Sequence, residues 1–350
     1  MPSNETLPEV RSSGADDRAR MLSLINANWT TQALSAATRI GVPDLLRTGP
    51  QTAQTLAHAS GCHGRSLWRL LRALTSLEVL HESAGGLFSL TPAGTLLCSG
   101  ASGSLAGWAV LCGTSSWEAW GRLGESLRDG QSSRKRDGGA DGFAFLEDHP
   151  ESALLFNQAM VGLTRPVAQA VAETLDLSGF RVIMDVGGGH GELVATLLAR
   201  QPSLHAILFD LAHATRGAAD RLAAASVEDR CTLVAGNFFD SVPGGADAYL
   251  LKSILHDWDD ERAGAILRSC RRAMAPHARL YVIERIAPER LTTSAVDQGI
   301  ARSDLQMLVS TGGCERTRQQ YERLLDGARL RIERLLALCA PFAALEAVPC

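Results

Sequence analysis

The sequence predicts a doubly wound α/β domain in the second half of the chain and a helical domain before it. After residue 180, short apolar segments alternate with helical patterns, which is typical of a parallel sheet covered by helices on both faces. Before residue 180, apolar residues recur mainly at helical spacing. The 350 residues are 45% hydrophobic and 21% charged, an ordinary globular composition. We therefore expect a helical domain over 18–100, a helical linking segment over 101–178 and an α/β domain over 179–350.

The predicted N-terminal domain has the order helix, helix, hairpin. Helical patterns run to residue 46, from 52 to 61 and from 65 to 80, and two glycines at 85 and 86 turn a hairpin. This is the outline of a winged helix-turn-helix. Residues 1–100 carry eight arginines, no lysine and seven acidic residues, which leaves too little positive charge to neutralise phosphates. The sequence favours a packing or dimerisation module, with a DNA-binding regulator that senses a nucleotide-like ligand as the alternative.

Bulk properties limit the other partners and the compartment. The net charge of −4 gives no global electrostatic case for binding nucleic acid or an anionic membrane. No apolar run approaches the ~20 residues of a membrane span, and no signal peptide is visible. The eight cysteines form no CxxC pair and stand at no zinc spacing. We expect free thiols and a cytoplasmic protein.

The central motif is the run Asp185-Val186-Gly187-Gly188-Gly189-His190-Gly191. An apolar strand pattern precedes it and a helical pattern follows it, so the motif predicts a tight turn between strand and helix. Glycines in such a turn let a ligand lie against the main chain and the helix N-terminus. The motif is therefore typical of a site for a nucleotide-like cofactor.

Two acidic residues help to choose the cofactor. Asp210 ends the second predicted strand, where a carboxylate can accept both hydroxyls of an adenosine ribose, in NAD or in S-adenosylmethionine (SAM). Glu192 occupies the position at which the dinucleotide fingerprint needs a glycine. The sequence therefore favours SAM, with NAD as the alternative.

Several motifs follow one another in order along the chain. They are the glycine run above, Phe209-Asp210-Leu211, Gly236-Asn237-Phe238-Phe239-Asp240, Leu251-Lys252-Ser253-Ile254-Leu255-His256-Asp257-Trp258-Asp259-Asp260, Asp304-Leu305-Gln306-Met307 and Gly312-Gly313-Cys314-Glu315-Arg316-Thr317. Together they resemble the caffeic acid and acetylserotonin O-methyltransferase family, in its bacterial secondary-metabolism branch. The resemblance runs from about residue 18 to the C-terminus and implies a Rossmann-like SAM methyltransferase domain after a winged-helix-like dimerisation domain. It further implies a homodimer, SAM as methyl donor with S-adenosylhomocysteine as product, no metal, and a hydroxylated aromatic or polyketide-like acceptor.

The resemblance assigns a catalytic role to His256 and supporting roles to Glu284 and Glu315. His256 follows the fourth predicted strand, and a histidine with a pKa of about 6.5 is a workable base for a phenol with a pKa of roughly 10. Carboxylates beside the ring orient it and stabilise the imidazolium. The acids Asp257, Asp259 and Asp260 suggest helix capping rather than a magnesium site.

The remaining assignments concern cofactor and acceptor. Asn237 stands where the family more often has an acid, and its carbonyl can still accept from an adenine amino group. Trp258 is predicted either to pack on the adenine or to lie in the core. The cofactor set is Asp185, Gly187, Gly189, Asp210, Leu211, Asn237, Phe238, Lys252 and Trp258. The acceptor set is Trp117, Phe156, Met160, Asp257, Asp304 and Met307.

Fold and cofactor site do not determine the reaction. The sequence therefore leaves open an enzyme on the same scaffold that methylates carbon or nitrogen, or that uses SAM for another reaction. It does not identify the acceptor.

Overall fold

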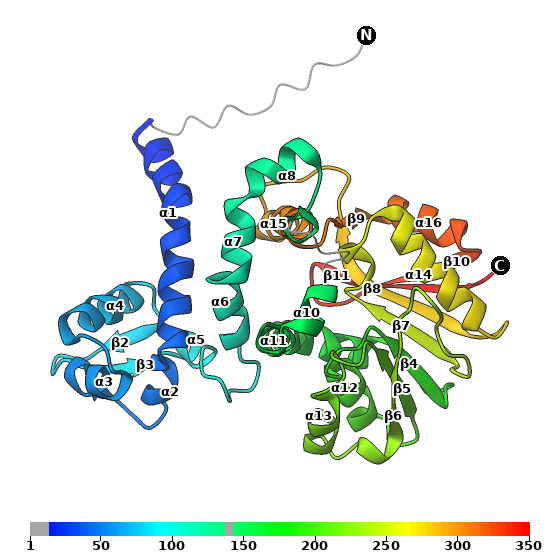
Figure 1. The fold of residues 1–350 in the computed structure, drawn as a ribbon, viewed down its shortest axis with the longest axis horizontal. Helices are drawn as coiled ribbons and strands as arrows, with labels where there is room; N and C mark the ends of the chain where they lie inside the picture. Colours follow the sequence, from blue (N-terminus) through cyan, green and yellow to red (C-terminus); the bar gives the residue numbers. More distant parts are fainter. Residues whose placement is uncertain (1–13, 137–142) are drawn as a thin grey trace, which may run out of the picture. The chain divides into compact units, whose positions relative to one another are not determined.

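The computed structural model describes residues 14–136 and 143–350, which form two compact units (Figure 1). One unit ends at Cys98 and the other begins at Ser99. The segment 101–178 lies within the second unit, and the division of the chain into three parts stays a prediction. Part of the N-terminus in which we looked for a signal peptide, residues 1–13, lies outside the described range.

The first unit contains the predicted order of helix, helix and hairpin. The long first helix stops before Gly41, which has a φ of 79°, and Pro43 lies in the first turn of the next helix. The hairpin belongs to a three-stranded sheet with the order β1-β3-β2. The winged-helix assignment itself stays a prediction. The elements are α1 (Gly14–Arg39), α2 (Val42–Leu46), β1 (Gln51–Thr52), α3 (Ala53–Ser60), α4 (Gly64–Ser76), β2 (Leu80–Glu82), β3 (Leu87–Leu90) and α5 (Pro92–Thr95).

The core of the first unit is built on one face of α4. Leu67, Leu71 and Leu74 recur at helical spacing and are buried against Leu56 of α3 and Phe88 of β3. Thr52 caps α3, since its hydroxyl accepts a hydrogen bond from the Thr55 N–H.

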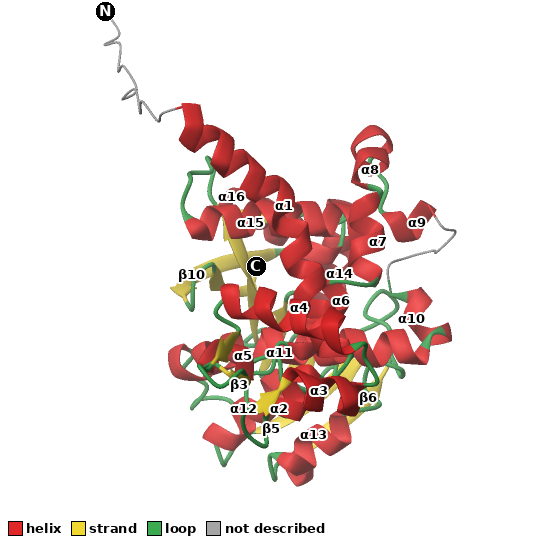
Figure 2. Ribbon diagram, turned by 90° about the vertical axis from the view of Figure 1, so that its left-hand side faces the viewer, coloured by secondary structure: helices red, strands yellow, loops and turns green. Residues whose placement is uncertain are grey.

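In the described part of the second unit, six helices precede the first strand. Figure 2 draws these helices in red and the strands in yellow. The helices α6 and α11 pack closely because glycines face the neighbouring backbone. A Cβ atom on Gly107 would lie 2.8 Å from the Ala159 nitrogen, and one on Gly162 would overlap the Ser104 carbonyl. The helices are α6 (Ala106–Cys112), α7 (Ser115–Gly121), α8 (Leu123–Asp129), α9 (Ser133–Arg136), α10 (Ala144–Asp148) and α11 (Pro150–Thr174).

A mixed sheet follows, with the strand order β10-β11-β8-β7-β4-β5-β6 and with β9 beside β8. The five strands predicted from apolar segments are all present, and they pair in parallel. The prediction missed β10 and β11, which join the edge of the sheet in antiparallel pairing. The strands are β4 (Val182–Val186), β5 (His205–Asp210), β6 (Cys231–Ala235), β7 (Ala248–Lys252), β8 (Arg279–Ala287), β9 (Arg316–Thr317), β10 (Leu330–Ala337) and β11 (Phe342–Pro349).

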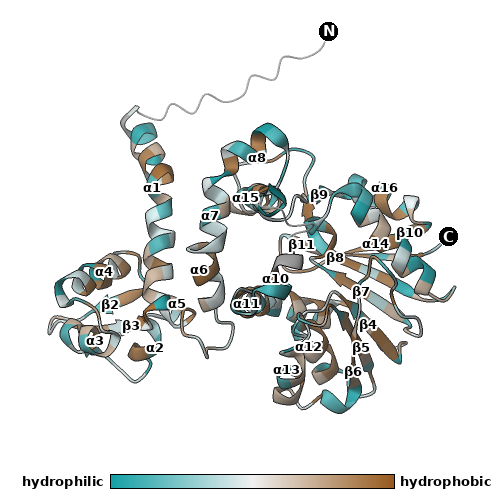
Figure 3. Ribbon diagram, viewed as in Figure 1, coloured by the Kyte–Doolittle hydropathy of each residue, from teal (hydrophilic) through white to brown (hydrophobic). Residues whose placement is uncertain are grey.

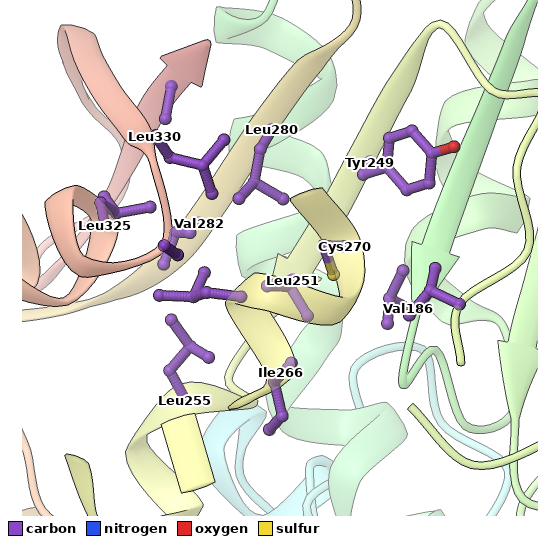
Figure 4. Close-up of a cluster of buried hydrophobic side chains, with 14 of the residues drawn as sticks. Val186, Tyr249, Leu251, Leu255, Ile266, Cys270, Leu280, Val282, Leu325 and Leu330 are labelled. Carbon is purple, nitrogen blue, oxygen red and sulfur yellow. The ribbon is translucent and has the colours of Figure 1, made fainter. Parts of the chain in front are cut away.

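Helices cover both faces of this sheet, and the strands are largely hydrophobic in Figure 3. Met184 and Val186 of β4 pack with α14 and α16, whereas Ile183 packs with α11, α12 and α13. Figure 4 shows the first cluster, which includes Leu255, the residue before His256. The helices are α12 (Glu192–Arg200), α13 (Ala218–Ala224), the 3₁₀-helix η1 (Glu228–Arg230), the 3₁₀-helix η2 (Leu255–Asp257), α14 (Asp260–Ala273), α15 (Ala295–Ser310) and α16 (Arg318–Gly327).

Candidate active site

The strand order reverses between β4 and β7. From β4 the chain continues to β5 and β6 on one side, and then returns to place β7 on the other. Open α/β sheets bind ligands at the carboxyl ends of strands beside such a reversal. The glycine loop follows β4 and the His256 segment follows β7, so the two sequence motifs meet at this point. A Cβ atom on Gly187 would overlap the Ile254 side chain, which shows how closely they approach.

The glycine loop requires glycine at several positions. Gly187, Gly189 and Gly191 have φ angles of 79°, 54° and 75°, in the left-handed region that other residues rarely adopt. A Cβ atom on Gly189 would meet no heavy atom within 4 Å, so this part of the loop faces open space. A ligand can therefore lie directly against the main chain here.

Asp210 joins the end of β5 to the glycine loop. Its Oδ2 accepts a 2.8 Å hydrogen bond from the Gly189 N–H, and its Oδ1 accepts a 2.6 Å bond from the Leu211 N–H. Burial raises the pKa of Asp210, against the lowering effect of these two bonds. Each carboxylate oxygen keeps a second lone pair, so Asp210 can still accept hydroxyl hydrogens from a ribose.

Asp185 and Lys252 lie at the ends of β4 and β7. Asp185 is buried, its Oδ2 has no hydrogen-bond partner among the described residues, and burial raises its pKa to about 7. Lys252 donates a 2.8 Å hydrogen bond to the Thr164 hydroxyl of α11. Burial lowers the pKa of Lys252 to about 8, although the Glu284 charge acts in the opposite direction. An unpartnered buried carboxylate is a natural partner for a cationic group of a ligand.

The predicted adenine-binding residues belong to an aromatic cluster. The Trp258 ring stands edge to face with Phe239 at 4.8 Å and Phe238 at 6.1 Å, and the Arg262 guanidinium lies 4.3 Å from the Phe239 and Trp258 centroids. Trp258 is buried and forms part of the core cluster. The side-chain oxygen Oδ1 of Asn237 accepts a 2.9 Å hydrogen bond from the Phe239 N–H, so only the second lone pair of Oδ1 is available for an adenine.

Three carboxylates surround the buried His256 ring. Nδ1 lies 3.2 Å from Oε1 of Glu315 and 3.7 Å from Oε2 of Glu284, and Nε2 lies 3.9 Å from Oδ1 of Asp257. Burial by itself would lower the pKa of His256, but the negative charges of Glu284, Asp257 and Glu315 outweigh burial and raise it to about 9. The surroundings therefore stabilise an imidazolium.

The two glutamates differ in what else they bind. Oε1 of Glu284 accepts hydrogen bonds of 2.9 and 2.8 Å from the N–H groups of Ile254 and Leu255, so this residue shapes the turn that carries His256. Burial, followed by the Glu315 charge, raises the pKa of Glu284, with His256 opposing. Burial would also raise the pKa of Glu315, but the bond to His256 and its charge, together with the Ser303 bond and the Arg285 charge, outweigh burial and lower it.

Arg316 clamps the same turn from the other side. Its fully buried guanidinium donates 2.7 Å hydrogen bonds to the carbonyls of Leu255 and Trp258 and a 2.9 Å bond to Asp260. Gly313 lies so close to this backbone that a Cβ atom would come within 2.6 Å of the Trp258 nitrogen. The Gly-Gly and Glu-Arg motif therefore holds the His256 turn as well as supplying Glu315.

The residues predicted for the acceptor lie in different surroundings. Asp257 faces His256, and Asp304 accepts a 2.8 Å hydrogen bond from the Glu315 N–H. The Phe156 ring lies 5.9 Å from that of Phe143, which in turn lies 5.7 Å from Trp258. Met160 and Met307 are half-buried on α11 and α15, and Trp117 is 38% exposed on α7. Their contact with an acceptor stays a prediction.

Several contributors were not expected as site residues from the sequence. Thr164 binds Lys252 from 88 positions away, and no local pattern marks it. Ser303 and Arg285 both bond to Glu315. Their only signal in the sequence is that each adjoins a residue already predicted for the site, Asp304 or Glu284.

Asp259 caps α14 through the Arg262 N–H, which confirms the capping prediction for that acid. Within residues 14–136 and 143–350, no group of three or more metal-ligating side chains could hold a metal, and no helix is long and apolar enough to cross a membrane.

Comparison with known proteins identifies the family. A model of the O-methyltransferase domain matches residues 120–331, and a model of the O-methyltransferase dimerisation domain matches residues 22–100. The chain belongs to the O-methyltransferase family. This confirms the resemblance and the expected α/β methyltransferase fold with a dimerisation domain before it.

Relatives within this family are similar to this chain along most of their length. The phenazine O-methyltransferase PhzM of Lysobacter antibioticus is 36% identical over 330 residues, which cover 94% of this chain and 95% of that protein. The 3-amino-4-hydroxybenzoate 4-O-methyltransferase of Streptomyces cremeus is 40% identical, covering 91% and 87%. The structure of human N-acetylserotonin methyltransferase in complex with SAM has a TM-score of 0.87 at 26% identity, covering 98% and 99%. The relatives thus agree with the predicted enzyme class and cofactor.

Proposed function

We propose that this O-methyltransferase transfers the methyl group of SAM to a hydroxyl group of an aromatic small molecule, with His256 as the general base. The single observation that carries the proposal is the buried His256 ring, held by Glu315 and Glu284 at the end of β7 beside the glycine loop. The aromatic acceptors in the names of the two bacterial relatives support the acceptor class.

The residues at the end of β4 fit SAM. The open main chain at Gly189 and the carboxylate of Asp210 suit an adenosine, and the unpartnered oxygen of Asp185 suits the ligand's ammonium group. When bound, SAM would supply a methyl group attached to a sulfonium sulfur. Loss of that methyl group leaves the sulfur as a neutral thioether. The chain's own part is to orient the acceptor, exclude water and remove a proton.

His256 receives that proton through Nε2. With hydrogen on Nδ1 donated to Glu315, the Nε2 lone pair is free to accept the hydrogen of an acceptor hydroxyl. A phenol has a pKa of about 10, close to the pKa of about 9 of His256, so the transfer is nearly balanced. The carboxylates of Glu315, Glu284 and Asp257 then stabilise the imidazolium.

The experiment is a mass-spectrometric screen with SAM carrying a deuterated methyl group. Phenols, hydroxybenzoates and hydroxyphenazines serve as acceptors, each beside its aniline and O-methyl counterparts. We expect the label on oxygen for at least one hydroxylated acceptor and none on its O-methyl ether. Label on nitrogen or carbon alone would replace this proposal with methylation of another atom on the same scaffold.

We also propose that the protein acts as a homodimer through its first unit, without nucleic acid. The dimerisation-domain match and an exposed apolar row on α1 support this, since Met21, Leu24, Ile25 and Trp29 are 56 to 67% exposed. A Trp29→Glu variant should shift the mass measured by analytical ultracentrifugation from dimer to monomer. Tight, salt-dependent binding to duplex DNA would instead favour the regulator alternative.

A further inference from the structure

Ser303 and His256 bond to the same oxygen atom of Glu315. The Ser303 hydroxyl on α15 donates a 2.6 Å hydrogen bond to Oε1 of Glu315, the atom that lies 3.2 Å from Nδ1 of His256. Nη1 of Arg285 reaches the same oxygen at 3.5 Å. Oε2 of Glu315 is buried and has no hydrogen-bond partner among the described residues, so all three donors share one side of the carboxylate.

The bond lengths show which donor Glu315 favours. A 2.6 Å O–H···O⁻ bond lies in the range of strong charge-assisted hydrogen bonds, whereas the 3.2 Å bond to the imidazole is at the long end. The Glu315 main chain is also fixed, because its N–H donates to Asp304 at 2.8 Å. The Glu315 carboxylate is therefore held closer to Ser303 of α15 than to the His256 ring.

We propose that Ser303 is a positioning residue that tunes the base, since its hydroxyl draws Glu315 away from His256 and weakens the hold of that carboxylate on the imidazolium. This inference rests on the proposed function of His256 and adds a residue of α15 to it. Too strong a pair would keep the ring protonated, and a protonated ring accepts no proton from an acceptor hydroxyl.

The charged and titratable groups around this network come from several elements. The groups that surround Glu315 and His256 are Asp257 on η2, Glu284 and Arg285 on β8, Lys252 on β7, Arg134 on α9, Asp304 on α15, Cys314, Arg316 on β9 and Tyr321 on α16. None of these groups is changed when the Ser303 hydroxyl is removed, so its effect can be measured against a constant background.

The test is a Ser303→Ala variant of the full-length enzyme, with Ser303→Thr to restore the hydroxyl and Ser269→Ala as the matched control. Ser269 is also buried, but its hydroxyl has no hydrogen-bond partner in the described structure and it lies on α14 outside the site. The primary measurement is the titration of His256 by NMR of protein labelled with ¹⁵N-histidine, assigned with His256→Gln. This readout needs no acceptor.

In Ser303→Ala, Glu315 is free to approach Nδ1, so the titration of His256 should move to higher pH by about 0.5 to 1 unit, the equivalent of one hydrogen bond. Turnover at pH 7 should fall about three- to tenfold and recover above the new midpoint. Ser303→Thr and Ser269→Ala should titrate as wild type does.

An unchanged or lower midpoint in Ser303→Ala, with wild-type circular dichroism, would overturn the proposal. If the alanine variant does not fold, Ser303→Cys keeps the size with a weaker donor, and its midpoint must also move upward. Absence of turnover with every acceptor would count against the proposed function, whereas the titration decides the role of Ser303 separately.

Discussion

The Nζ atom of Lys252 lies 2.8 Å from the hydroxyl oxygen of Thr164, so a half-buried hydrogen bond joins the end of β7 to the middle of α11. Burial lowers the pKa of this lysine to about 8, and the Glu284 charge is the largest effect that opposes burial. The bond fixes the position of a cation whose charge acts on Asp185, the residue that begins the glycine run. It therefore links α11 to the proposed cofactor site.

Replacing Thr164 by valine should weaken cofactor binding. The ammonium group of Lys252 would lose its acceptor in a buried place, which costs about 1–3 kcal/mol, and the Kd of S-adenosylhomocysteine should rise about tenfold. Isothermal titration calorimetry at pH 7 measures this. Thr75→Val, a change on α4 of the first unit, is the control and should bind as wild type does. Equal affinity in the two variants would show that Lys252 does not depend on Thr164.

Replacing His256 by alanine should abolish most turnover while leaving cofactor binding nearly intact. The loss of a general base costs about 10²–10⁴-fold in kcat, and we propose Nε2 of His256 as the atom that accepts the proton. S-adenosylhomocysteine affinity should change less than about threefold, because the ring does not form the glycine loop. His277→Ala, at an exposed position after α14, is the matched control. Wild-type turnover in His256→Ala would contradict the role of this residue.

Activity should rise with pH up to about 9. Since Glu284, Asp257 and Glu315 outweigh burial and raise the pKa of His256 from 6.5 to about 9, the neutral base is scarce at pH 7 and gains tenfold per pH unit below the midpoint. The same shift stabilises the folded protein fully below pH 6.5, and this contribution is lost as the pH rises through about 9. Rate profiles should therefore be measured beside thermal melts at each pH. A flat kcat/KM between pH 7 and 9 would argue against His256 as the titrating base.

Replacing Arg316 by glutamine should destabilise the fold. The buried guanidinium would be lost together with its bonds to the carbonyls of Leu255 and Trp258, and breaking such a buried site costs about 3–5 kcal/mol. Urea unfolding followed by fluorescence measures the change. The control Arg318→Gln, two residues further along the chain, removes an exposed ion pair with Glu322 and should cost at most about 1 kcal/mol. A similar loss of unfolding free energy in both variants would mean that the Arg316 hydrogen bonds stabilise the fold no more than a surface ion pair does.

The sequence predicted the five parallel strands because each is a short apolar segment flanked by turn residues, a local signal. It missed β10 and β11 for a physical reason. Arg331, Arg334 and Glu333 interrupt the apolar pattern of β10, and its pairing with β11 depends on a register across a turn that no local residue specifies.

The sequence by itself determined the glycine turn after Asp185, the position of His256 at the end of a strand and the family of the protein. These depend on residues that are neighbours in the chain. Only the tertiary structure decided that Glu315 takes Nδ1 of His256, that Glu284 also builds the turn and that Ser303 shares the Glu315 oxygen. Residues 12 to 59 positions apart meet there, because β8 and the Gly-Gly loop pack against the end of β7 and α15 brings Ser303 to Glu315. The distances between their atoms, which no local sequence pattern specifies, determine how strongly the carboxylates act on the His256 ring.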